Sequence, residues 1–132
     1  MNKFILTTAS IVMGLALQAQ ELKVEFKGLK VAEGKLYVAV VDANNKEIRA
    51  EVIEVTDKTV SFNFGTVEAE TIGIRVYHDA NSNGKMDTGF MGIPTETYGF
   101  SKDARGTFGP PELSEYLVSL KEGNNLLVIN LE

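Results

Sequence analysis

The chain has 132 residues, with 13 basic and 18 acidic side chains, a formal net charge of −5 and no cysteine. This length supports one domain with a single core. The acidic balance argues against nucleic acid as a partner, because phosphates require a basic surface, and it is better suited to cations. Since no disulfide is possible, burial and any bound ion must stabilise the fold.

The first 20 residues are typical of a secretory signal peptide. Lys3 gives a positive start, the run 4–17 is almost wholly apolar, and small or neutral residues follow. A membrane anchor is the alternative, but the run is shorter than the roughly 20 residues that span a bilayer. We expect cleavage after Ala19 or Gln20, visible by mass spectrometry as a new N-terminus, and a periplasmic or secreted product without a transmembrane segment.

The mature chain, residues 21–132, alternates apolar and polar residues in short runs, as β-strands with one wet face do. Glycine- and asparagine-rich turns separate these runs. The runs are residues 21–28, 34–42, 47–55, 59–67, 71–79, 116–120 and 125–132. They predict an all-β fold, a single antiparallel β-sandwich of about seven strands with immunoglobulin-like or transthyretin-like architecture and no helix of three or more turns.

The inward positions of the runs predict the core, and one long connection interrupts them. The predicted core residues are Val24, Phe26, Leu36, Val38, Val40, Phe62, Phe64, Ile72, Ile74, Val76, Leu126 and Val128. Residues 79–115 form a loop excursion rich in glycine, proline and polar residues. Connections of this length usually carry function or pack on themselves.

Residues 79–87, DANSNGKMD, place oxygen atoms at the spacing of a calcium loop, with Gly84 where the chain must turn around the ion. The predicted ligands are the side chains of Asp79, Asn81, Asn83 and Asp87 and the carbonyl of Lys85. Position 12, where a bidentate glutamate usually completes the shell, is Phe90. The loop therefore predicts weak, structural calcium binding, with a dissociation constant of about 10⁻⁴ to 10⁻³ M. The alternative is a series of Asx-turns without an ion.

Other chemistry-bearing residues give weaker signals. His78, the one histidine, lacks the partners of a zinc site and is expected to be structural or on the surface. The aromatic residues of the excursion could form a stacking platform for a sugar or peptide, or the loop's own small core. They are Phe90, Tyr98, Phe100 and Phe108. Asp87 and Glu96 could act as an acid and base pair, but no catalytic motif accompanies them.

The motif HDANSNGKMD at 78–87, followed by GIPTETYGFS at 92–101 and FGPP at 108–111, resembles the signature of DUF2141, a bacterial family of exported proteins with a domain of unknown function. The similarity covers nearly the whole mature chain. It implies export and a small β-rich domain, and it implies no substrate or mechanism.

These observations favour an exported, non-catalytic accessory module that binds an unidentified protein, peptide or glycan and carries a weak calcium loop. A carboxylate-dependent hydrolase and a purely structural cell-envelope protein are the alternatives. Turnover in a glycan and ester substrate screen that disappears in Glu96→Gln would identify the hydrolase.

Overall fold

The computed structural model describes residues 19–80 and 97–132, and every structural statement below refers to these two segments. Their strands are, in chain order, β1 (Gln20–Lys27), β2 (Lys35–Asp42), β3 (Glu47–Glu54), β4 (Val60–Val67), β5 (Thr71–Asp79), β6 (Tyr98–Phe100), β7 (Leu117–Ser119) and β8 (Gly123–Asn130). The short helices η2 (Ser101–Asp103) and α1 (Leu113–Tyr116) lie between β6 and β7. None of the described helices is long and apolar enough to cross a membrane.

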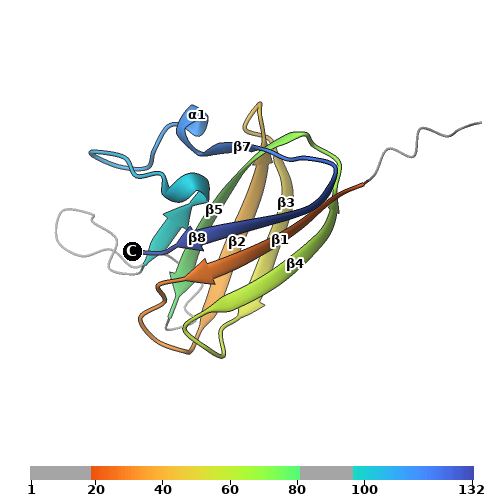
Figure 1. Ribbon diagram of the computed structural model, residues 1–132. Helices are drawn as coiled ribbons and strands as arrows, with labels where there is room; N and C mark the ends of the chain where they lie inside the picture. Colours follow the sequence, from red (N-terminus) through yellow and green to blue (C-terminus); the bar gives the residue numbers. More distant parts are fainter. Residues whose placement is uncertain (1–18, 81–96) are drawn as a thin grey trace, which may run out of the picture.

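The strands form two packed sheets, which confirms the predicted all-β sandwich (Figure 1). One sheet has three strands in the order β4-β1-β8. The other has five strands, in the order β3-β2-β5-β6, with β7 paired to the same edge of β5 as β6. The described pairings are antiparallel except that of β1 with β8, which is parallel. β1 and β8 come from opposite ends of the described chain, so no short hairpin between them imposes an antiparallel direction. Their parallel pairing is the one departure from the predicted antiparallel pattern among the described strands.

The core lies between the sheets and takes the inward residues of each strand. Nine of the predicted core residues are buried there, and Phe62 packs against them half-buried. Leu126 and Val128 are corrections, because they are 60% and 41% exposed on the outer face of β8. β8 instead turns Asn125, Leu127 and Ile129 inward. The run 126–129 is apolar at every position, so alternation alone cannot decide which side faces the core.

The described part of the predicted excursion is built into the fold. β6 extends the five-stranded sheet, and the chain between β6 and β7 places Tyr116 against Val41 and Gly73 on that sheet's outer face. A second buried cluster of Val41, Phe100 and Tyr116 forms there. Gly73 of β5 allows this contact, because a Cβ there would lie 2.6 Å from Cε2 of Tyr116.

The segment predicted to be removed on export lies mostly outside the described residues, which begin at Ala19. Gln20, the last residue of the predicted signal peptide, is already the first residue of β1 and pairs with Val67 and Gly123. Cleavage after Ala19 would leave β1 whole.

Candidate functional site

The first predicted calcium ligand, Asp79, is the last residue of β5, and its side chain is fully buried. β5 holds its backbone opposite Lys35 of β2. The other predicted ligands, Asn81, Asn83, Lys85 and Asp87, lie outside the described residues. Within 19–80 and 97–132, no three histidine, aspartate or glutamate side chains gather as a metal site.

His78 is buried beside this end of β5, with 2% of its surface exposed. Its Nε2 lies 2.6 Å from the carbonyl oxygen of Glu33. A carbonyl oxygen only accepts hydrogen bonds, so Nε2 carries the proton and donates. The imidazole thus ties the loop before β2 to the core, which is the structural role expected for it.

The aromatic residues predicted as a platform or a loop core are divided between different places. Phe100 belongs to the buried cluster with Tyr116, at 5.0 Å between ring centroids. Phe108 is fully exposed, and Phe90 lies outside the described residues. Tyr98 is half-buried on the outer face of the five-stranded sheet, at the edge of a hollow.

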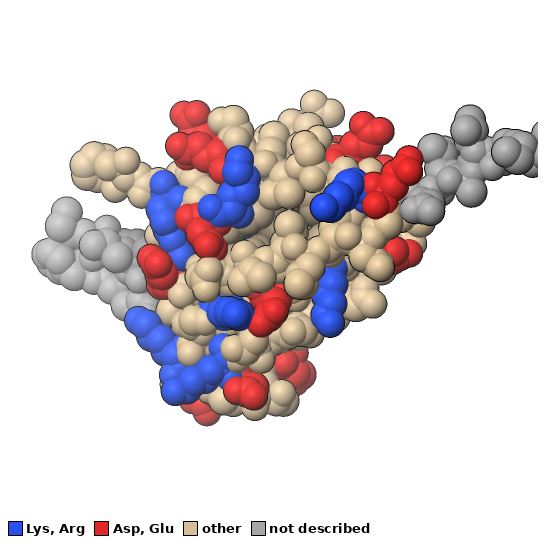
Figure 2. Space-filling view, in the orientation of Figure 1, with Lys and Arg blue, Asp and Glu red and all other residues tan. Residues whose placement is uncertain are grey.

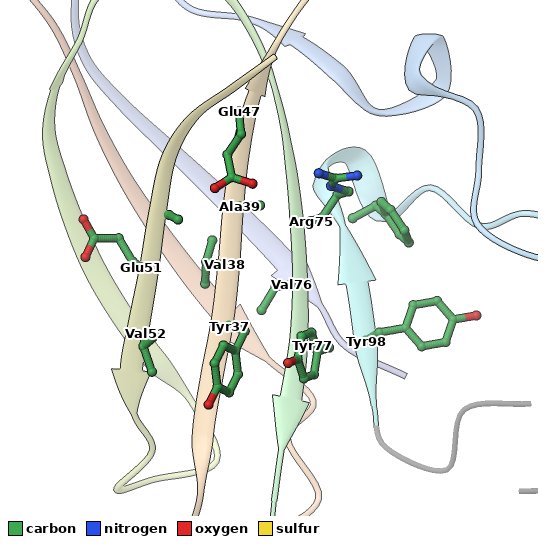
Figure 3. Close-up of a pocket in the computed structure, with 12 residues that line it drawn as sticks. Tyr37, Val38, Ala39, Glu47, Glu51, Val52, Arg75, Val76, Tyr77 and Tyr98 are labelled. Carbon is green, nitrogen blue, oxygen red and sulfur yellow. The ribbon is translucent and has the colours of Figure 1, made fainter. Parts of the chain in front are cut away.

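A row of apolar and aromatic side chains crosses that outer face, one from each of four neighbouring strands. The register places Val52 of β3 opposite Tyr37 of β2, Tyr37 opposite Tyr77 of β5, and Tyr77 opposite Tyr98 of β6. The rings of Tyr37 and Tyr77 are stacked at 5.0 Å with 6° between their planes. Figure 3 shows the row at one level of the sheet. We call Val52, Tyr37, Tyr77 and Tyr98 the tyrosine row.

Beside the tyrosine row the face is hollowed, because the next row of the sheet contains small residues. Ala50 pairs with Ala39, which pairs with Arg75, which pairs with Phe100. The two alanines leave space between the tyrosines and the segment that covers Val41. The hollow measures about 430 Å³, within the size range of small-molecule sites.

Charged groups stand at the end of the hollow away from the tyrosine row. Figure 3 shows the Arg75 guanidinium and the Glu47 carboxylate there, on side chains from β5 and β3. Glu51 also lines the hollow, but its carboxylate accepts from Nη2 of Arg49 at 2.8 Å and points away from the tyrosines (Figure 3). Among the described residues, Arg75 forms no ion pair and no hydrogen bond through its guanidinium.

The outer face of the three-stranded sheet has a different composition. On β1 it presents Lys23, Glu25 and Lys27, and Nζ of Lys27 lies 3.5 Å from Oε1 of Glu25. Figure 2, which looks onto this sheet, shows basic and acidic side chains interspersed over the face. This face also exposes Leu126 and Val128 of β8, so what distinguishes the five-stranded sheet is the alignment of aromatic side chains in the tyrosine row.

Of the residues in the tyrosine row and the hollow, Tyr98 and Phe100 were predicted from the sequence as possible ligand contacts. Tyr37, Tyr77 and Arg75 occupy the solvent-facing positions of strands that were recognised correctly. The sequence signal that could have identified the two tyrosines is an aromatic residue at a strand position that alternation predicts to face solvent. Their alignment across four strands depends on register, which one sequence does not reveal.

A comparison with protein-family models matches residues 24–127 to the family described as "Uncharacterized protein conserved in bacteria (DUF2141)". Searches of curated proteins and of solved structures found no significant match. The match covers most of the chain, and it includes the tyrosine row and the hollow. The chain belongs to the DUF2141 family.

Proposed function

We propose that this protein is an exported, non-catalytic binding module, and that the tyrosine row and the hollow beside it bind a glycan. The observation that carries the proposal is the alignment of Val52, Tyr37, Tyr77 and Tyr98 on a solvent-facing sheet surface. A contiguous apolar patch next to a concave site is typical of ligand binding rather than of ordinary protein surface.

The chemistry of the face suits a sugar chain. Tyrosine combines an apolar ring, which packs against the C–H groups of a sugar, with a hydroxyl that exchanges hydrogen bonds with sugar hydroxyls. The row crosses three inter-strand spacings of about 4.8 Å each. Its total length therefore exceeds that of one sugar ring. A short oligosaccharide is therefore the expected ligand.

Binding is favoured over hydrolysis by the carboxylates at the hollow. Glycoside hydrolysis ordinarily uses two carboxyl groups on opposite sides of the bond that breaks. Glu51 is held by Arg49 and points away, which leaves Glu47 directed at the hollow (Figure 3). The alternative pair, Asp87 and Glu96, lies outside the described residues, so the hydrolase stays a prediction of the sequence.

The test is an oligosaccharide panel with neutral and acidic members, followed by calorimetry and by NMR of the tyrosine and alanine signals. Tyr37→Ala removes part of the row, and Ala50→Trp fills the hollow from an exposed position. We expect both to weaken binding at least about tenfold, since hot-spot aromatics are worth roughly 2 kcal/mol. Leu126→Ser, an exposed apolar change on the other sheet, is the matched control. If no oligosaccharide binds, or if Ala50→Trp binds as well as wild type, the proposal is wrong and a structural envelope role is favoured.

We also propose that the segment beginning at Asp79 binds calcium weakly and is ordered by it. The support is the oxygen spacing and the fixed backbone of Asp79 at the end of β5. The chain also contains a turn that begins with the same three residues, Asp42-Ala43-Asn44. There, Oδ1 of Asp42 accepts from the amides of Asn44 and Lys46 at 2.8 and 3.0 Å, which is the ion-free alternative.

Calcium at about tenfold excess over its dissociation constant should stabilise the protein by roughly 1.4 kcal/mol and raise its melting temperature by about 4 to 8 °C. Calorimetry and thermal melting of chelator-treated protein measure both. Asp79→Ala should abolish the shift, whereas Asp42→Ala should keep it. An equal response in wild type and Asp79→Ala would reduce the motif to a turn.

A further inference from the structure

Arg75 differs from the other two arginines of the chain in having no partner among the described residues. Arg49 donates to Glu51 at 2.8 Å and to the carbonyl of Phe64 at 2.9 Å. Arg105 donates to the carbonyls of Tyr98 and Asn130 at 2.9 and 3.0 Å and lies 3.7 Å from Glu132. Arg75 is half-buried in the second row of the hollow, between Ala39 and Phe100.

An unpartnered cation on a partly buried surface does not serve stability. Partial burial removes water from the guanidinium, and no carboxylate of the described segments pairs with it in compensation. Its planar fork of donors fits a carboxylate bidentately. Arg75 holds this fork at the end of the hollow away from the tyrosine row, where a ligand that extends from the row into the hollow would meet it (Figure 3).

We infer that the ligand carries a carboxylate that pairs with Arg75, so the ligand class is an acidic glycan containing uronic acid. The inference rests on the proposed function and names the substrate class for the same site. The sugar rings contact the tyrosine row while one carboxylate reaches the guanidinium. Glu47, at the same end of the hollow, disfavours a second negative charge there and accepts hydrogen bonds from sugar hydroxyls.

The net charge of the protein opposes the inferred preference for an acidic ligand. The chain is acidic, with a formal charge of −5, so its general field repels an anionic glycan. Any preference for the charged form of a sugar must therefore arise locally, and Arg75 is the cation that the hollow offers among the described residues.

The experiment compares a short oligogalacturonate with its fully methyl-esterified form, which keeps the sugar chain and removes the charge. In wild type, we expect calorimetry at low salt to give at least about tenfold tighter binding of the acid form, since a hydrogen bond to a charged group is worth about that much. Arg75→Gln should lose this preference and retain binding of the ester, and Arg75→Lys should restore part of it. Glu47→Gln should act in the opposite direction and tighten binding of the acid.

Stability separates recognition from a structural role for the arginine. Because the guanidinium of Arg75 has no hydrogen-bond or ion-pair partner to lose within 19–80 and 97–132, Arg75→Gln should leave the melting temperature unchanged or raise it. A lowered melting temperature with an unchanged acid preference would overturn the inference. Equal binding of acid and ester in wild type would also overturn it, while leaving the proposed glycan site in place. Failure of both sugars to bind, or binding that survives Ala50→Trp, would overturn the inference together with the glycan site.

Discussion

Asn125 is a polar residue at a core-facing position, and its side-chain hydrogen bonds explain why it lies there. Its Oδ1 accepts from the amide of Lys121 at 3.0 Å. Its Nδ2 donates to the carbonyls of Lys121, Gly123 and Glu21 at 2.8, 3.3 and 3.1 Å. One amide therefore closes the turn between β7 and β8 and attaches it to β1. These bonds offset the cost of burying it, since only 7% of its surface is exposed.

Asn125→Ala should lower the free energy of unfolding by about 2 kcal/mol, because four backbone groups lose their hydrogen-bond partner. Water can take the place of the side chain at some of these groups, which limits the loss. Urea unfolding followed by circular dichroism measures the change. Asn124→Ala is the matched control, since Asn124 is its exposed neighbour in the same strand, and it should change stability by less than about 0.5 kcal/mol. A similar effect of both substitutions would contradict this role.

The same residue explains why Leu126 and Val128 were wrongly predicted to lie in the core. The strand was recognised, but the apolar run 126–129 fits either face, and Asn125 takes a core-facing position because its amide is hydrogen-bonded. Hydrophobicity cannot recognise an amide whose hydrogen-bond partners come from residues 4 and 104 positions away. In β1 no such group competes with alternation, and Val24 and Phe26 are buried as expected.

At the scale of the elements, Ser101 extends the sheet where β6 ends. Its Oγ accepts from the amide of Ile74 at 3.0 Å and donates to the carbonyl of Tyr116. The hydroxyl thus replaces a backbone hydrogen bond between strands, and it joins the chain before β7 to β5. It also supports the cluster of Val41, Phe100 and Tyr116, which bounds one end of the hollow.

Ser101→Ala should destabilise the protein by about 2 to 4 kcal/mol, because two buried backbone groups are left unsatisfied. It should also broaden the NMR signals of Tyr116 and Phe100 more than those of the tyrosine row. Ser61→Ala, an exposed position on β4, provides the comparison and should be nearly neutral. Loss of stability in Ser101→Ala without any change at Tyr116 would refute the proposed link.

The individual strands were predicted better from the sequence than the pairing between them. Each long strand could be recognised from its own residues, by alternation or by a short apolar run between turn signals, and all of them formed. β6 has three residues, Tyr98–Phe100, in a stretch of glycine and aromatics, and it pairs because β5 offers an edge. The tyrosine row likewise exists only after β2, β3, β5 and β6 have paired in register. Local pattern contains no information about such non-local pairing.

At the scale of the whole molecule, the outer faces of the two sheets differ in composition. The outer face of the three-stranded sheet mixes charges and favours solubility (Figure 2). The outer face of the five-stranded sheet carries the tyrosine row, with the hollow and Arg75 beside it. The acidic character and the all-β class followed from composition and alternation. The place of the proposed binding face did not, because it depends on which strand edges meet.

The parallel pairing of β1 with β8 has a mechanical consequence. The register from Gln20 opposite Gly123 to Lys27 opposite Asn130 directs the two ends of the chain to opposite ends of the sandwich. Force applied between residues 20 and 132 shears this ladder, so its rungs resist together, whereas force between residues 35 and 54, an antiparallel pair at the end of β2 and β3, opens rungs one after another. Single-molecule pulling should therefore give a higher rupture force from the chain ends, and equal forces would contradict this.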